Sequence, residues 1–299
     1  MFGRQDVTSL PPEQRNIAQI FQFPVVYETM TVAENLAFPL RNRNIPRAER
    51  EKRVEDVLSM LDLGAYANRK AHNLGADTKQ KISLGRGLVR TDVNAILFDE
   101  PLTVIDPALK WQLRAQLKKV HQEFNHTMIY VTHDQTEALT FADKVVVMRE
   151  GEVLQIGTAE ELFNFPSHTF VGKFIGSPGM NILPCEVQRK SAIIAGHRIA
   201  LAESYPAVTG KLELGIRPEH IDLREQGEVD DGIVVSIRSI ENIGRYKIVQ
   251  LALGEHSMKA LLPEGVPVPH SPVMSFRPDQ VRIYQDSVLL SSDGGTASQ

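Results

Sequence analysis

Two adjacent carboxylates close the apolar segment AILFDEP at residues 95–101, and their position suggests chemistry. Asp99 and Glu100 follow a short apolar run that is typical of a buried strand. In one interpretation this is a Walker B strand, in which Asp99 holds Mg²⁺ through water and Glu100 polarises an attacking water molecule. In the other interpretation it is only a buried strand followed by an acidic turn. The segment alone leaves both open.

Two other apolar segments are each followed by a polar residue that could belong to the same site. His133 follows TMIYVT at 127–132, and Gln22 follows IAQIF at 17–21. A lone histidine at a strand end is more often structural than catalytic. However, parallel strands place their carboxyl ends at one edge of a sheet, where α/β proteins build their sites. The agreement of three strand ends favours a site that includes Gln22, Glu100 and His133.

Several helix signals lie between the predicted strand at 17–21 and the predicted strand at 95–99. Residues 31–39 predict a short helix after Thr31 as N-cap, and Glu34 three residues later predicts a capping box. Apolar residues at helical spacing predict an amphipathic helix over 47–61. The stretch NLGADTKQ at 73–80 predicts another helix start, with Asp77 as its N-cap.

The next segments continue the alternation of helix and strand. Asp106 as N-cap and Pro107 at the first helical position predict a helix from 107 to about 124. Asp134, with Glu137 three residues later, predicts a helix start after the histidine strand, and KVVVM at 144–148 predicts a further strand. Strands that alternate with helices indicate an α/β domain built on a parallel sheet.

The character of the chain changes after about residue 173. Residues 174–185 are interpreted as a linker, 186–291 as an all-β domain and 292–299 as a disordered tail. GIRPEHIDL at 215–223 and SFRPDQVRIY at 275–284 form an internal repeat, which predicts a small barrel or sandwich of two related β units. Residues 1–173 form the α/β domain, with a helical subdomain at about 28–90.

Composition narrows the class of protein. The 299 residues carry a net charge of −4 and show no basic block, which disfavours a nucleic-acid partner. Cys185 is the single cysteine, so a disulfide framework is excluded and a reducing compartment is favoured. No apolar run approaches the roughly 20 residues that a bilayer-spanning helix needs. The start, MFGRQDVTSL, resembles neither a signal peptide nor a targeting sequence.

Taken together, these motifs resemble the ATP-hydrolysing subunit of an ABC transporter of the sugar and glycerol-phosphate importer type. PPEQRNIAQIFQFPVVYETMTVAENLAFPL at 11–40 resembles the Q-loop region, ILFDEPLTVIDP at 96–107 the Walker B and D-loop region, and the segment from 129 to 166 the switch-histidine region. The C-terminal repeat resembles the paired oligonucleotide-binding-like barrel called TOBE. The resemblance covers nearly the whole chain.

The resemblance implies roles for single residues. Glu100 and His133 would be catalytic, with His133 contacting the γ-phosphate of ATP, and Asp106 would be the D-loop acid. Asp99 and Gln22 would hold Mg²⁺ through water. ATP and Mg²⁺ are therefore the expected cofactors.

The sequence departs from the family pattern at the P-loop. The 299 residues contain no G-x-x-x-x-G-K-[ST] motif, whose backbone N–H groups and lysine cradle phosphates. The resemblance places that motif about 40 residues before MFGRQDVT, so we expect a missing N-terminal segment of roughly 60 residues. A misassigned start codon, a truncated gene and a true short form all fit this expectation.

A second departure lies at the signature motif, L-S-G-G-Q in the family. Leu74, Gly75, Ala76, Asp77 and Thr78 occupy its five positions. The family uses this helix start, with its serine, to bind the γ-phosphate of the ATP held by the opposite subunit. Two like unit charges at about 4 Å repel by about 4 kcal/mol at an effective dielectric constant of 20, so the Asp77 carboxylate is expected to spoil this site.

The partners follow from these departures. A second ATPase subunit with an intact signature would restore one good site, so a heterodimer with a paralogue is favoured over self-association. The helical segment between Gln22 and Asp77 is expected to dock integral-membrane permease subunits, with a solute-binding protein as an indirect partner. The resemblance places the protein peripherally on the cytoplasmic face of the inner membrane. The solute would be glycerol, another polyol, a sugar or glycerol phosphate. A non-catalytic regulatory subunit is the alternative function.

Overall fold

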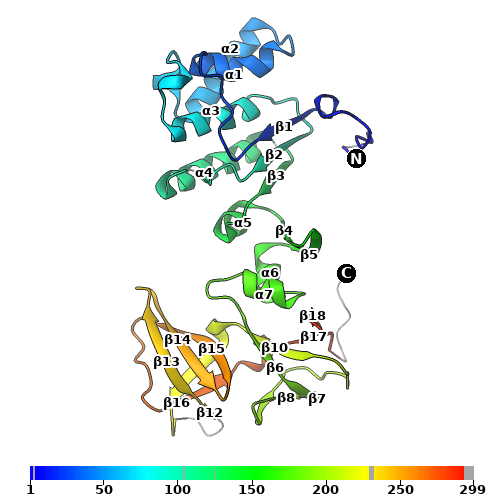
Figure 1. The fold of residues 1–299 in the computed structure, drawn as a ribbon, viewed down its shortest axis with the longest axis vertical. Coiled ribbons are helices and arrows are strands. Elements are labelled where there is room, and N and C mark those ends of the chain that lie inside the picture. The colour runs from blue at the N-terminus through cyan, green and yellow to red at the C-terminus, as the bar shows by residue number, and fades with distance from the viewer. Residues whose placement is uncertain (3, 104, 125, 229–231, 293–299) are drawn as a thin grey trace. The chain divides into compact units, whose positions relative to one another are not determined.

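The structure is a computed structural model that describes residues 1–2, 4–103, 105–124, 126–228 and 232–292. The chain divides into two compact units, Met1–Phe141 and Ala142–Gln299, which are described one at a time (Figure 1). The domain boundaries expected from the sequence remain predictions. The expected tail at 292–299 lies, apart from its first residue, outside the described residues.

Unit 1 is built on a sheet of three parallel strands in the order β1-β2-β3 (Figure 1). These strands are β1 (Ile17–Ile20), β2 (Ala95–Asp99) and β3 (Met128–Val131). Their register pairs Ile20 with Phe98 and Asp99 with Val131. The carboxyl ends of all three strands therefore meet at one edge, as the sequence predicts.

Helices accompany this sheet, and most of them begin close to the residues that local signals indicate. They are α1 (Val32–Arg41), α2 (Arg47–Met60), α3 (Ala76–Leu88), α4 (Pro107–Phe124) and α5 (Gln135–Phe141), with 3₁₀ turns at Pro12–Gln14, Gly64–Tyr66 and Ala71–Asn73. The capping box of α1 is confirmed: Glu34 N–H donates to Thr31 Oγ1 at 3.1 Å, and Thr31 N–H donates to Glu34 Oε2 at 2.8 Å.

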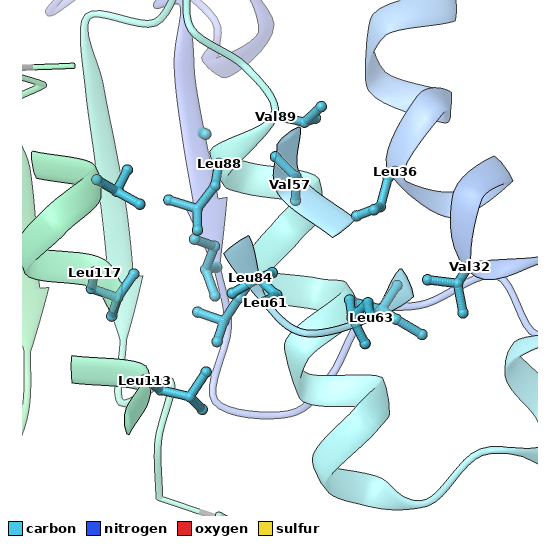
Figure 2. Close-up of a cluster of buried hydrophobic side chains, with 14 of the residues drawn as sticks. Val32, Leu36, Val57, Leu61, Leu63, Leu84, Leu88, Val89, Leu113 and Leu117 are labelled. Carbon is cyan, nitrogen blue, oxygen red and sulfur yellow. The ribbon is translucent and has the colours of Figure 1, made fainter. Parts of the chain in front are cut away.

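One apolar core joins the helices of unit 1 to the sheet. Figure 2 shows part of it, with buried side chains from α1, α2, α3 and α4 and from the turn after α2, namely Val32, Leu36, Val57, Leu61, Leu63, Leu84, Leu88, Val89, Leu113 and Leu117. Gly85 allows the close approach of α3 to its neighbours, because a Cβ there would lie 2.6 Å from Leu36 Cδ2.

The start of α3 differs from the sequence prediction. Gly75, with extended backbone, is the N-cap, and Asp77 lies inside the first turn, so the prediction of Asp77 as N-cap is wrong. Leu74 is buried in the core directly before this turn, and its packing fixes where the helix begins. In the first turn the Asp77 carboxylate faces the positive end of the helix dipole, a favourable position for an acid.

Unit 2 begins with a hairpin of β4 (Val145–Arg149) and β5 (Glu152–Gly157), followed by α6 (Ala159–Asn164) and α7 (Thr169–Phe174). β4 pairs with β5 in antiparallel fashion, whereas the sequence pattern favoured a strand of the parallel sheet. Glu150 and Gly151 both have positive φ, at 53° and 86°. That conformation suits a two-residue hairpin turn, so the local turn explains the antiparallel pairing.

The rest of unit 2 is all-β. Its strands are β6 (Asn181–Pro184), β7 (Glu186–Gln188), β8 (Ser191–Ile194), β9 (His197–Ala200), β10 (Leu212–Ile216), β11 (Ile221–Glu225), β12 (Ile233–Val234), β13 (Ser236–Asn242), β14 (Tyr246–Leu253), β15 (His256–Pro263), β16 (Pro272–Phe276), β17 (Arg282–Gln285) and β18 (Val288–Leu289). They form sheets ordered β18-β17-β10-β6, β11-β16-β12, β13-β14-β15 and β7-β8-β9.

The sequence repeat has a structural counterpart in this unit. In each copy a strand leads through a 3₁₀ turn into a second strand, with turns at Pro218–His220 and Pro278–Gln280. The copies pair reciprocally, because β10 of the first copy joins β17 of the second, and β16 of the second joins β11 of the first. The two β units therefore close on one another, as two related copies would.

Candidate functional site

Three predicted site residues meet at the carboxyl edge of the parallel sheet. Glu100 lies between the other two, because one carboxylate oxygen faces Gln22 and the other faces His133. Gln22 Nε2 donates to Glu100 Oε2 at 3.4 Å, and His133 Nδ1 lies 3.0 Å from Glu100 Oε1. The convergence of these side chains agrees with the expectation from the strand ends.

Glu100 is held in an unusual backbone conformation. Its φ is 44°, in the left-handed region that non-glycine residues rarely adopt. Its N–H donates to the carbonyl oxygen of Val131 on β3 at 3.0 Å, and Thr103 Oγ1 donates to its carboxylate at 3.2 Å. Conformations of this kind cost of order 1–3 kcal/mol and cluster at functional sites. The structure therefore maintains a strained residue where the sequence predicts a catalytic one.

Charge complementarity accompanies this geometry. The hydrogen bond from His133 lowers the pKa of Glu100, and the same contact raises the pKa of His133. His133 is mostly exposed, with 69% of its side chain accessible, while Glu100 is 26% accessible. The His133 ring therefore contacts a carboxylate and is also accessible to a ligand from solvent.

Asp99 lies beside this group as the last residue of β2, and its side chain is exposed. Within the described part of the chain, no hydrogen bond or ion pair engages its carboxylate. Such an oxygen donor is of the type that Mg²⁺ prefers. Asp106 lies directly before α4, and its carbonyl oxygen accepts the N–H of Lys110 at 3.0 Å, as expected of an N-cap.

The degenerate signature lies apart from these contacts. Gly75 and Asp77 are at the start of α3, and among the described residues neither is hydrogen-bonded to Gln22, Glu100 or His133. The Asp77 carboxylate likewise has no ion-pair partner in the described part of the chain. The first turn of α3 therefore presents an unneutralised acid.

Gln80 is a residue of this region that sequence reasoning missed. It lies on the buried face of α3 with no accessible surface. Its Nε2 donates to the carbonyl oxygens of Pro101 at 2.7 Å and of Phe21 at 3.3 Å, which adjoin Glu100 and Gln22 in the chain. Its spacing of four residues from Leu84 is the available sequence signal, since it places a polar side chain on the apolar stripe.

Comparison with known proteins shows to which family the chain belongs. The ABC transporter family matches residues 2–103, and the MalK OB-fold domain matches residues 176–221. An ABC transporter ATP-binding protein of Sinorhizobium fredii is 40% identical over 273 residues, which cover 90% of this chain and 72% of that protein. The chain belongs to the ABC transporter ATP-binding subunits.

Two further relatives of this ABC subunit carry names of solutes. The sn-glycerol-3-phosphate import ATP-binding protein UgpC of Cereibacter sphaeroides is 38% identical, over 94% of this chain and 79% of that protein. The sulfoquinovosyl glycerol transport ATP-binding protein SmoE of Agrobacterium fabrum is 34% identical, over 94% of this chain and 80% of that protein. Family members bind ATP and hydrolyse it to energise import, and the MalK OB-fold match agrees with the all-β unit.

Proposed function

We propose that this ABC subunit energises the import of a small polar solute that carries a glycerol group, with sn-glycerol 3-phosphate as the first candidate. The contact of Glu100 with both Gln22 and His133 is the observation that supports an ATP-hydrolysing role for this chain. The names of the relatives support the class of solute.

In this proposal the strand-end residues divide the work of hydrolysis. Glu100 orients the attacking water and draws its proton, a role that suits a carboxylate with a lowered pKa. His133 contacts the γ-phosphate, where its raised pKa favours the positive charge that a phosphate attracts. Asp106 would act as the D-loop acid at the dimer interface.

Mg²⁺ is the metal that this site would use. Asp99 and Gln22 would hold the ion through water, and the exposed carboxylate of Asp99 fits a hard cation that prefers oxygen donors. The bound ion would neutralise charge that develops on the phosphates.

Permease subunits would dock on the segment that follows β1. Every second residue from Phe21 to Tyr27 exposes an apolar side chain, and Phe23 is 69% accessible. By contrast, Val32, Leu36 and Leu40 of α1 are fully buried in the core. Exposed apolar residues beside the Gln22 contact would couple a membrane partner to the site.

The first turn of α3 supports a second ATPase subunit as partner. Asp77 there lacks a neutralising partner among the described residues and would repel the γ-phosphate of an ATP in the opposite subunit. A paralogue with an intact signature would supply one competent site. The assembly would lie on the cytoplasmic face of the membrane, with a solute-binding protein as an indirect partner. No described helix is both long and apolar enough to cross a bilayer.

Reconstitution tests this proposal. The chain is purified with the permease and ATPase subunits encoded beside it and placed in liposomes that contain the solute-binding protein. We expect sn-glycerol 3-phosphate to stimulate ATP hydrolysis and a paralogous ATPase to co-purify. Full stimulated activity in a homodimer would overturn the heterodimer. Stimulation only by a solute without a glycerol group would overturn the solute class. Full ATPase activity that survives loss of the Glu100 carboxylate would favour the non-catalytic regulatory alternative for this subunit.

A further inference from the structure

Glu137 is a buried carboxylate that lies outside the contacts of Gln22, Glu100 and His133 with one another. It lies on α5, is 3% accessible, and accepts two side-chain hydrogen bonds on its Oε2 atom. Tyr130 Oη donates at 3.0 Å and Thr132 Oγ1 at 2.9 Å. Both donors belong to the segment that leads from β3 into His133. A buried charge is retained in a fold only when such partners compensate it.

The hydrogen bonds continue through Thr132 to Asp134, the two chain neighbours of His133. Thr132 Oγ1 accepts the N–H of Asp134 at 3.0 Å while it donates to Glu137. Asp134 Oδ1 in turn accepts the N–H groups of Thr136 at 2.8 Å and of Glu137 at 3.3 Å. Both chain neighbours of His133 are thereby fixed, although His133 itself is exposed.

The role of Glu137 differs from that of a glutamate three residues after an N-cap, which often bonds back to the N-cap N–H. Asp134 caps α5 as expected, but the Glu137 carboxylate turns inward to Thr132 and Tyr130, and the Asp134 N–H pairs with Thr132 instead. The Glu137 side chain therefore hydrogen-bonds to residues at the end of β3 and not to the N-terminus of α5. Its position on the buried side of α5 is what allows this.

Charged and polar groups from α4, α5 and β3 lie around Glu137. Lys110 Nζ on α4 lies 3.8 Å from its Oε1. Arg114, one turn further along α4, is buried. Burial and the neighbouring Glu137 raise the pKa of Tyr130, although Arg114 acts in the opposite direction. Asp134 is the other acid that faces this group. The Tyr130 hydroxyl therefore keeps its proton and remains a donor.

We propose that Glu137 is a positioning residue, which holds His133 against Glu100 through the hydroxyl of Thr132. Its importance to catalysis rests on the proposed role of His133. The positioning itself can be measured in the full chain without nucleotide, so its failure is distinguishable from a failure of the proposed function.

The test follows the titration of His133 by NMR, with the resonance assigned from a His133→Gln variant among the nine histidines. Thr132→Val keeps the charge of Glu137 and removes the link, so we expect the pKa of His133 to fall toward its ordinary value as the Glu100 contact loosens. Glu137→Leu should have at least the same effect. Glu137→Gln keeps an acceptor for Thr132 and should lower the pKa less. Tyr130→Phe removes only the other donor and should leave the pKa unchanged.

Two results would overturn the proposal. If Thr132→Val lowers the melting temperature but leaves the pKa of His133 at its wild-type value, Glu137 only stabilises the fold. If Glu137→Gln lowers that pKa as far as Glu137→Leu does, the effect is one of charge alone. Should Glu137→Leu fail to fold, Thr132→Val, which exchanges side chains of similar size, still decides between these outcomes.

Discussion

Replacing Gln80 with leucine should loosen the two chain segments that carry Gln22 and Glu100. Leucine is close to glutamine in size but cannot donate to the carbonyl oxygens of Pro101 and Phe21. A buried acceptor that loses its donor costs about 1–3 kcal/mol. The 2.7 Å bond to Pro101 is fully buried and should account for most of this, whereas the 3.3 Å bond to Phe21 is only partly buried.

A smaller gain offsets part of this loss. Gln80 Oε1 is itself buried without a hydrogen-bond partner among the described residues, and leucine removes that unpaired atom. We therefore expect the Gln80→Leu substitution to lower the free energy of unfolding of unit 1 by about 1–3 kcal/mol in total.

Urea unfolding of the full chain measures this effect. The single tryptophan, Trp111, lies on α4, so its fluorescence follows the unfolding of unit 1 separately from unit 2. Gln112→Leu on the exposed side of α4 is the matched control. It makes the same exchange of side chains and should change the free energy of unfolding by less than about 0.5 kcal/mol. A Gln80→Leu protein that unfolds at the same urea concentration as the control would refute the assigned role of Gln80.

Other predictions concern packing, capping and charge. Gly85→Ala should destabilise unit 1 by about 1–3 kcal/mol in the same urea assay, because its Cβ would lie 2.6 Å from a side-chain carbon of α1; an unchanged midpoint would contradict the close helix contact. Thr31→Ala should cost about 1 kcal/mol in the same assay, because the N–H of Glu34 loses its side-chain acceptor at the start of α1, and an unchanged midpoint would contradict this cap. The contact of Glu100 with His133 should stabilise the chain between the lowered pKa of the acid and the raised pKa of the histidine. The contribution is full from about pH 4.5 to 6.5, the usual pKa values of the two groups. It is lost as pH rises through the raised pKa of His133 or falls through the lowered pKa of Glu100. Melting curves of wild type and Glu100→Gln should therefore converge at high pH, and a constant difference across the range would contradict the pairing.

Local signals in the sequence predicted which residues lie at the ends of the parallel strands. AILFDEP and TMIYVT are short apolar runs whose polar ends can lie only where the strands end, and parallel pairing brings those ends to one edge. The pairs Thr31–Glu34 and Asp106–Pro107 predict helix starts through contacts between near neighbours, so the structure reproduces them.

Features that depend on distant contacts were not predictable in this way. Asp77 is a good N-cap in isolation, but the packing of Leu74 starts the helix at Ala76. The antiparallel pairing of β4 depends on the Glu150–Gly151 turn. Gln80 and Glu137 bind partners that the fold, and not the local sequence, brings to them.

Glu100 is the residue on which the proposed ATP hydrolysis depends most directly. Glu100→Gln keeps the size of the side chain and a hydrogen-bond acceptor for His133 but removes the carboxylate. In the transporter purified with its partner subunits, we expect this variant to bind ATP as tightly as wild type and to lose at least about 100-fold in ATP turnover at the site that contains Glu100. The decisive measurement is single-turnover hydrolysis of bound ATP, compared between the wild-type and Glu100→Gln transporters. Retained ATP without hydrolysis is the predicted result, and unchanged turnover would contradict the central claim.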